Sequence, residues 1–181
     1  MKFIDLHRDP WHELGGEDGP AACIDPAPNL LLSVEQWHAF RAQWPAGMPV
    51  GVALANDAEI KEIAADLPRL SLVVLKFPKW VDGRAYSQAH TLRARHRFAG
   101  EVRAVGDVLV VMVPLLARTG FDAALLRPDQ SVDAAHRALC FFPGHYQADA
   151  ADPVPLFAKP PGTADALVRS HDEFVNSGAA I

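Results

Sequence analysis

The chain has 181 residues, of which half are hydrophobic and 22% are charged, as expected for one folded domain of ordinary size. Its formal net charge of -5 argues against a protein that mainly binds nucleic acid, because such a protein needs a cationic surface. The N-terminal residues do not resemble a signal peptide, and the longest apolar run, Val108–Ala117, is about half a membrane span. We expect a cytoplasmic protein with no membrane or nucleic-acid partner, whose Cys23 and Cys140 are reduced and largely buried.

Residues 1–30 are rich in proline, glycine and acids and predict an extended arm or short edge strands, with apolar pieces at Phe3–Leu6 and Ala21–Ile24. A regular alternation follows. Apolar runs predict strands at 50–55, 70–77, 102–105 and 123–126. Amphipathic spacing and capping signals predict helices at 33–43, 56–67, 84–97, 108–118 and 131–141.

Strands separated by helices of this length pair in parallel through right-handed crossovers. The predicted fold class is therefore α/β, with successive βα units and a mainly parallel sheet that is either open or part of a (β/α) barrel. Residues 1–147 are expected to form one domain, and 148–181 a proline-rich tail with a short helix at Ala164–Asn176. The tail would pack on the domain or on a partner subunit. Exposed strand edges favour a homodimer.

Polar side chains follow the predicted strands, where parallel α/β folds place their sites. These side chains belong to Asn56, Asp57, Lys76, Lys79, Asp82, Arg84, Asp107, Arg127 and Asp129. A simpler explanation competes with a site, because Asn56, Asp82, Asp107 and Ser131 stand where helix N-caps are expected. Capping alone favours short polar residues there, at about 1 kcal/mol each.

The loop from Phe77 to Ser87 contains more polar groups than one cap requires. Lys79 and Arg84 beside a helix N-terminus form a candidate anion site, because the backbone N–H groups and the helix dipole reinforce the two cations. Tyr86, His90, Arg93 and Arg97 follow at helical spacing and form either a solvated face or a surface for an anion or a partner.

Other motifs are missing from the sequence. The eight histidines lack HExxH, HxH or a Cys/His cluster, so no metal site is predicted. GxSxG, P-loop and GxGxxG motifs are also absent, and the cofactor, if any, stays unassigned. Asp5 and His7 could share one face of a strand, but a surface turn is the simpler explanation.

Three segments, FPKWVDGRAYSQA (77–89), AGEVRAVGDVL (99–109) and ARTGFDAALLR (117–127), occur in an order and spacing that resemble one bacterial family. It comprises domain-of-unknown-function proteins encoded with assimilatory sulfite reductase genes, often described as a predicted oxidoreductase probably involved in sulfite reduction. The resemblance extends from about Gly51 to Gln147. It departs from the family pattern at His90, where the family usually has arginine, and at Val111, where it usually has aspartate.

The resemblance implies an accessory protein of assimilatory sulfate or sulfite reduction, and in its enzymatic form an oxidoreductase that handles sulfite or sulfate at the carboxyl edge of the sheet. The candidate catalytic residues are Asp82, Arg84 and Asp107, and the candidate substrate-binding residues are Lys79, Arg84, Tyr86, Ser87 and Arg103. Two alternatives stay open. One is a non-catalytic partner that docks on sulfite reductase through the Tyr86/His90/Arg93/Arg97 face and the tail. The other is a small-anion binding module.

Overall fold

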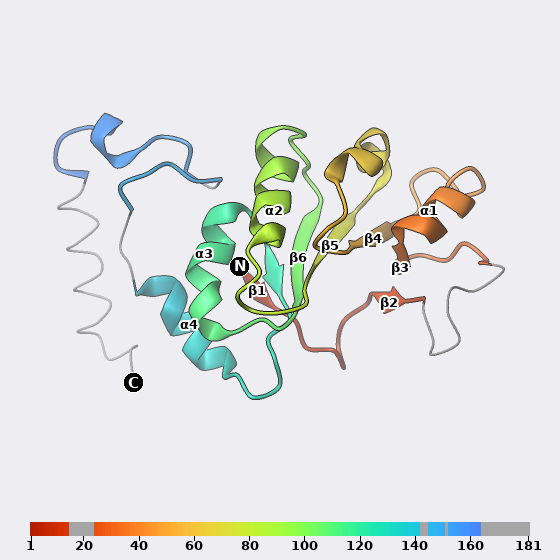
Figure 1. Ribbon diagram of the computed structural model, residues 1–181, viewed down its shortest axis with the longest axis horizontal. Coiled ribbons are helices and arrows are strands. Elements are labelled where there is room, and N and C mark those ends of the chain that lie inside the picture. Colours follow the sequence, from red (N-terminus) through yellow and green to blue (C-terminus); the bar gives the residue numbers. More distant parts are fainter. Residues whose placement is uncertain (15–23, 142–144, 151, 164–181) are drawn as a thin grey trace.

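The structure is a computed structural model that describes residues 1–14, 24–141, 145–150 and 152–163. Within these residues, seven strands form one all-parallel sheet in the order β1-β7-β6-β5-β4-β3-β2. The sheet is curled into a half-barrel (Figure 1), so the α/β prediction is confirmed and the sheet is the barrel-like one of the two alternatives. The strands are β1 (Lys2–Phe3), β2 (His12–Glu13), β3 (Leu30–Ser33), β4 (Val50–Leu54), β5 (Leu72–Phe77), β6 (Glu101–Gly106) and β7 (Ala123–Ala124).

The two edge strands, β1 and β2, are joined directly by residues 4–11, which we call the strap. Seven strands spaced about 4.8 Å apart make the sheet roughly 29 Å wide along its surface. The strap contains a turn, because Arg8 N–H donates to Asp5 C=O at 3.0 Å, so it cannot reach the roughly 30 Å of a fully extended segment of this length. The curl of the sheet brings its edges within reach of the strap. As expected, Asp5 and His7 lie in this exposed turn.

The helices and 3-10 turns pack on the outer face of the curled sheet (Figure 1). This layer contains α1 (Val34–Phe40), η1 (Ile60–Glu62), η2 (Ala64–Arg69), α2 (Arg84–Ala94), η3 (Val110–Met112), α3 (Val113–Thr119) and α4 (Val132–Cys140). A further 3-10 turn, η4 (Leu156–Ala158), lies in the C-terminal segment. The main core fills the space between this layer and alternate residues of each strand, for example Val52 and Leu54 of β4 and Val73 of β5. Burial of these apolar side chains supplies most of the stability of such a fold.

The inner face of the sheet carries a second, smaller apolar cluster that consists of Leu31, Ala53, Leu72 and Val74. Trp11 of the strap packs on this cluster. Gly51 permits the close approach, because a Cβ atom there would lie 3.1 Å from both Trp11 Cζ3 and Leu31 Cδ1. The strap therefore covers part of the inner face by placing the Trp11 ring against Gly51 of β4.

Three local signals are confirmed in detail. Ser33 and Gln36 form the predicted capping box, since Ser33 Oγ accepts from Gln36 N–H at 3.2 Å and Gln36 Oε1 accepts from Ser33 N–H at 2.8 Å. Ser131 caps α4 by accepting from Ala134 N–H at 3.3 Å. Gly120 ends α3 in the left-handed region with φ of 101°, which favours glycine.

The helix expected at 56–67 is wrong in type, because the chain forms the 3-10 turns η1 and η2 there, with Pro68 inside η2. These turns still bury the expected residues Ile60, Ile63 and Leu67. The helix expected at 108–118 is divided into η3 and α3, and α1 and α2 end earlier than expected, at Phe40 and Ala94.

Strand β3 was not predicted, because its short apolar run Leu30–Leu32 lies between the arm expected at 1–30 and the helix start at Ser33. The two-residue strand β2 was also missed, because His12–Glu13 has no apolar signal and pairs only through its backbone. Cys140 is exposed, contrary to expectation, since it lies at the exposed end of α4. Cys23 and the helix expected at 164–176 lie outside the described residues.

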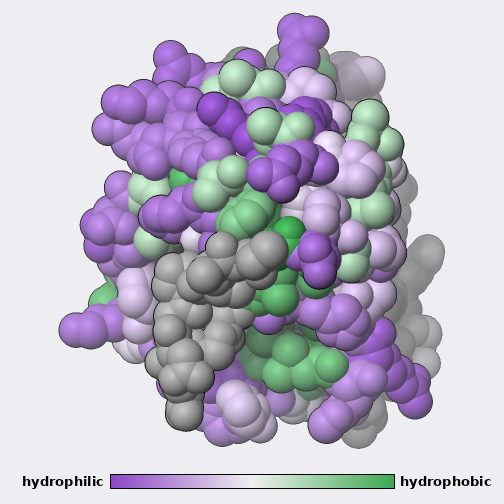
Figure 2. Space-filling model, turned by 90° about the vertical axis from the view of Figure 1, so that its right-hand side faces the viewer, coloured by the Kyte–Doolittle hydropathy of each residue, from purple (hydrophilic) through white to green (hydrophobic). Residues whose placement is uncertain are grey.

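Figure 2 views the molecule from the side of α1 and shows a largely hydrophilic surface with hydrophobic surface gathered near its centre. The expected homodimer stays a prediction, and this side of the half-barrel is one place where its interface can be tested. Among the described residues, none of the helices has both the length and the apolar character needed to cross a membrane.

Candidate functional site at the carboxyl edge of the sheet

All strands of a parallel sheet end at the same edge, and the loops that follow β4, β5, β6 and β7 here contain most of the polar residues that the sequence singled out. We call this edge the carboxyl edge. Its charged side chains form two clusters of ion pairs.

Asp82 is the centre of the first cluster. Its carboxylate accepts from Arg84 Nε at 3.0 Å and from Arg84 Nη2 at 2.7 Å, which is a bidentate pair. It also accepts from the backbone N–H of Arg84 at 3.2 Å and from Asn56 Nδ2 at 2.6 Å. The hydrogen bonds from Arg84 lower the pKa of Asp82 to about 2. This cluster therefore joins the loop after β4 to the start of α2.

The second cluster is centred on Arg127. It donates to Asp107 Oδ1 at 2.9 Å and, through two nitrogens, to Asp129 at 2.5 and 2.6 Å. The other oxygen of Asp107 accepts from the backbone N–H of Trp80 at 2.9 Å. The hydrogen bonds from Arg127 lower the pKa of Asp129 to about 2. Asp107 thus connects the loops after β5, β6 and β7.

The two clusters decide between capping and cross-linking for the polar residues of this edge. The side chains of Asn56 and Asp107 form hydrogen bonds to other loops. The prediction that these two residues act as helix N-caps is therefore wrong. Asp82 precedes the N-cap residue Gly83 of α2 but occupies its first turn, because it accepts the N–H of Arg84. The carboxylate of Asp82 thus lies where a bound anion was expected.

The other candidate residues of the loop after β5 have separate environments. Lys79 is exposed and makes no ion pair with the described residues. Tyr86 packs inward with ring-centroid distances of 5.1 Å to Phe77 and 6.4 Å to Phe121, and burial raises its pKa. Ser87 is exposed and lines a pocket on the flank of α2. The structure therefore brings Asp82, Arg84 and Asp107 to one edge but does not gather the substrate-binding set around a single cavity.

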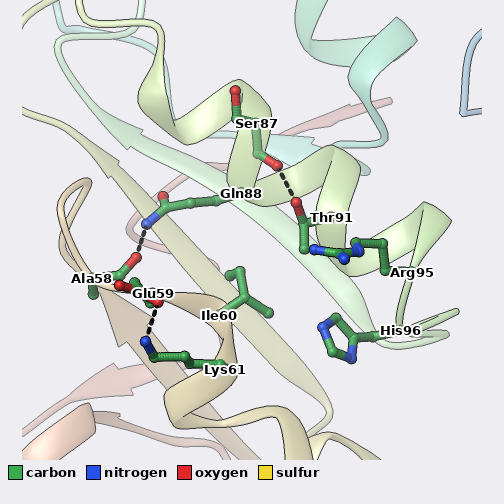
Figure 3. A pocket seen from close by; sticks show the side chains of 9 residues that line it. All are labelled: Ala58, Glu59, Ile60, Lys61, Ser87, Gln88, Thr91, Arg95 and His96. Carbon is green, nitrogen blue, oxygen red and sulfur yellow. Dashed lines mark hydrogen bonds and ion pairs between the residues drawn. The ribbon is translucent and has the colours of Figure 1, made fainter.

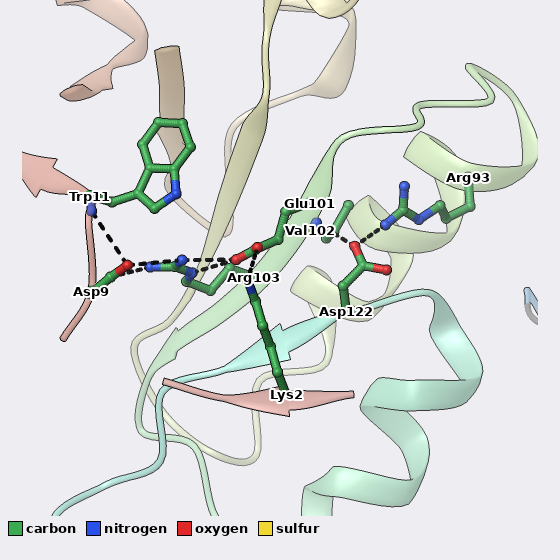
Figure 4. A network of polar contacts seen from close by, with 8 residues as sticks. All are labelled: Lys2, Asp9, Trp11, Arg93, Glu101, Val102, Arg103 and Asp122. Atoms are coloured by element: carbon green, nitrogen blue, oxygen red, sulfur yellow. Dashed lines mark hydrogen bonds and ion pairs between the residues drawn. The ribbon is translucent and has the colours of Figure 1, made fainter. Parts of the chain in front are cut away.

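Arg103 lies away from this edge, on the inner face of the sheet (Figure 4). Its guanidinium forms an ion pair with Asp9 of the strap, and its Nε donates to Glu101 Oε1 at 2.9 Å. Lys2 in turn pairs with Glu101 at 2.5 Å. The side chains of Arg103 and Asp9 are 5% and 7% exposed. We call these four residues the inner-face network, and the structure does not bring Arg103 to the other candidate residues.

Arg93 is likewise a structural residue. Its guanidinium donates to the backbone carbonyls of Phe98, Gly100 and Gly120 and pairs with Asp122. Asp122 also accepts from Val102 N–H at 2.8 Å (Figure 4). With Tyr86 and Arg93 turned inward, only His90 and Arg97 of the expected docking face are exposed. The expected Tyr86/His90/Arg93/Arg97 surface is therefore not one continuous face.

Exposed apolar side chains also follow the strands at the carboxyl edge. Leu6 follows β1, Trp80 and Val81 follow β5, and Val111 follows β6, and we call these four residues the edge patch. They are 67%, 51%, 66% and 73% exposed, in that order. Because they are large, exposed and follow strands that end at one edge of the sheet, this edge is a candidate interaction surface. The sequence did hold a signal for them, an apolar Trp80-Val81 pair inside an otherwise polar loop.

A family model described as "Bacterial protein of unknown function (DUF934)" matches residues 51–157, which is more than half of the chain. The chain belongs to this family. The matched region contains both carboxyl-edge clusters and Arg103 but begins after Asp9 and the strap. A comparison with curated proteins finds no match.

The two positions at which the sequence was expected to depart from the family pattern, His90 on α2 and Val111 in η3, are both exposed. Because Val111 faces solvent, a carboxylate at this position would also face solvent. A valine in place of a carboxylate at this position would change the character of the surface and leave the two ion-pair clusters intact.

Proposed function

We propose that this protein is a non-catalytic accessory protein of assimilatory sulfite reduction, which docks on sulfite reductase through the carboxyl edge of its sheet. The observation that carries the proposal is the edge patch, in which Trp80, Val81 and Val111 are each more than half exposed. Tryptophan and arginine are among the residue types most often found at energetic centres of protein interfaces. Trp80 stands four residues before Arg84, and its backbone N–H donates to Asp107 of the Arg127 cluster.

The charges of the edge support docking over the binding of a small anion. Arg84 is already paired with Asp82, and Arg127 with Asp107 and Asp129. A free sulfite or sulfate would have to displace these carboxylates. A protein surface instead needs its arginines held in place before contact, because ordering long side chains at an interface costs about 0.5–1.5 kcal/mol each.

Binding to purified sulfite reductase from the same organism tests the proposal. We expect Trp80→Ala to weaken the complex by about 2 kcal/mol, or roughly 30-fold in Kd, as is typical of a central interface tryptophan. The matched control is Phe157→Ala, because Phe157 is 69% exposed and lies beside Tyr146 in the C-terminal segment. This control is expected to bind like the unchanged protein.

Three outcomes would contradict the proposal. The first is equal binding by Trp80→Ala and the unchanged protein, and the second is no complex at micromolar concentrations. The third is turnover of sulfite by the isolated chain, accompanied by visible absorbance from a bound redox group, which would favour an oxidoreductase. The anion-binding alternative predicts instead that sulfite or sulfate raises the melting temperature and that Arg84→Ala abolishes the rise.

A further inference from the structure

A groove runs along the flank of α2, and Figure 3 shows the part of it that lies between α2 and the 3-10 turn η1. It consists of two adjacent hollows of 330 and 360 Å³ that share His96. Ser87, Thr91 and Arg95 line the first hollow from α2 and the residue after it, and Glu59 and Lys61 line it from the opposite side. Leu67, Pro68 and Phe98 give the second hollow an apolar lining.

The groove exists because the connection from β4 to β5 consists of short 3-10 turns. A longer α-helix at this position would cover this flank of α2, as α3 covers the other flank. Gln88 holds the two walls together, since its Nε2 donates to Ala55 C=O at 2.9 Å and to Ala58 C=O at 2.8 Å. The groove is therefore a built feature of the fold.

The cations of the groove contrast with the arginines that form ion pairs elsewhere in the described chain. Arg84, Arg93, Arg103 and Arg127 are each paired with a carboxylate. Arg95 and Arg97 are exposed and form no ion pair with any described residue, and the exposed His96 lies between them. Lys61 stands on the opposite wall and is paired with Glu59 at 2.6 Å. The protein as a whole has a net charge of -5, so the unpaired positive charge of Arg95 and Arg97 is a local feature of the groove.

Arg97 also adopts a backbone conformation that glycine adopts more easily. Its φ is 50°, and the α2 terminus around it is closed by hydrogen bonds from His96 N–H to Thr91 C=O and from Phe98 N–H to Leu92 C=O. Glycine is the usual residue at such a left-handed position after a helix, because a Cβ atom there is strained. The chain thus keeps an exposed arginine where folding alone favours glycine, and strained residues of this kind concentrate at binding sites.

We propose that this groove binds an acidic peptide segment of a partner protein. Arg95, His96 and Arg97 face the carboxylates of the segment, and the hollow lined by Leu67, Pro68 and Phe98 accepts one bulky apolar side chain. The α2 helix runs antiparallel to the strands, so its C-terminal end and the groove lie toward the opposite edge of the sheet from the edge patch. The groove is therefore a second surface, and it does not depend on the proposed docking at the carboxyl edge.

A peptide suits this surface better than a nucleic acid does. Binding of a phosphate backbone needs an extended series of cations, whereas here the cations end at the apolar lining of the second hollow. The overall negative charge of the protein also opposes a polyanion that extends beyond the groove.

The test measures binding of a fluorescein-labelled polyglutamate peptide with one central phenylalanine to the full chain by fluorescence anisotropy. We expect binding that weakens as NaCl is raised from about 0.1 M to 1 M, because the screening length falls from about 10 Å to 3 Å. Removal of both rim charges in Arg95→Ala/Arg97→Ala is expected to weaken binding about tenfold or more. Arg137→Ala is the matched control, because Arg137 is exposed and without an ion pair among the described residues but lies on α4.

A second variant separates binding from folding. Arg97→Gly is expected to raise the melting temperature by roughly 2–4 °C, since it relieves about 1 kcal/mol of backbone strain, while it weakens peptide binding. Equal peptide affinity in the unchanged protein and the double variant would overturn the proposal, as would tighter binding of a single-stranded RNA oligonucleotide than of the peptide. Trp80→Ala should leave peptide binding unchanged, so failure here is distinct from failure of the proposed function.

Discussion

The inner-face network and the carboxyl-edge clusters use the same chemistry in opposite environments. Arg103 and Asp9 are 5% and 7% exposed, whereas Arg84 keeps 59% of its side-chain surface exposed and Arg127 keeps 43%. A buried pair leaves an uncompensated charge when one partner is removed, while water replaces the lost partner of an exposed pair. The comparison indicates that the inner-face pair fastens the strap to the half-barrel and that the edge pairs are available for recognition.

The largest expected effect is the loss of one partner of the buried pair. Either Asp9→Ala or Arg103→Ala should lower the free energy of unfolding by about 3–5 kcal/mol, measured by urea denaturation. The apolar double variant Asp9→Leu/Arg103→Met should recover much of this loss, because it removes both charges together. A loss below about 1 kcal/mol in the single variants would show that water reaches the pair and that the comparison is wrong.

Arg93 should follow next in size. Arg93→Ala removes the donor of the carbonyls of Phe98, Gly100 and Gly120 and leaves Asp122 with only its bond from Val102 N–H. We expect a loss of about 2–4 kcal/mol in the same measurement. Arg95→Ala, two residues along the chain, is the control and should be close to neutral because Arg95 is exposed. Equal losses in the two variants would mean that the role of Arg93 lies in its contribution to α2 and not in its bonds.

The smallest expected effect is on the stability of the protein at low pH, and it tests the carboxyl edge alone. Asp82 and Asp129 both have a pKa lowered to about 2 in the folded protein, against about 3.9 for a free aspartate. A lowered pKa gives stability that is present above about pH 4 and is lost as the pH falls toward 2. The urea midpoint of Asp82→Asn/Asp129→Asn should therefore fall less between pH 4 and pH 2 than that of the unchanged protein. An identical fall would show that these exposed pairs do not contribute to acid sensitivity.

The features that could be predicted from the sequence depend on neighbours along the chain. The apolar runs at β4, β5 and β6, the capping box at Ser33, the cap at Ser131 and the stop at Gly120 all involve contacts within a few residues. The orientation of Arg103 also follows from strand alternation. Val102 and Ala104 face the helices, so Arg103 must face the other side of the sheet.

Tertiary structure decided the partners of the polar residues. Asn56 and Asp82 are 26 residues apart, Trp80 and Asp107 are 27 apart, and Asp9 and Arg103 are 94 apart. Each of these polar groups could instead form hydrogen bonds with water or with nearby residues, as a helix cap does. The free energy of such local bonds is similar to that of the long-range bond. Only the parallel pairing of the strands, together with the strap that joins β1 to β2 across the inner face, selects among these alternatives. For this reason the sequence alone determined the α/β fold and the edge at which polar groups gather, while the pairing of the strands and the strap determined which of these groups meet.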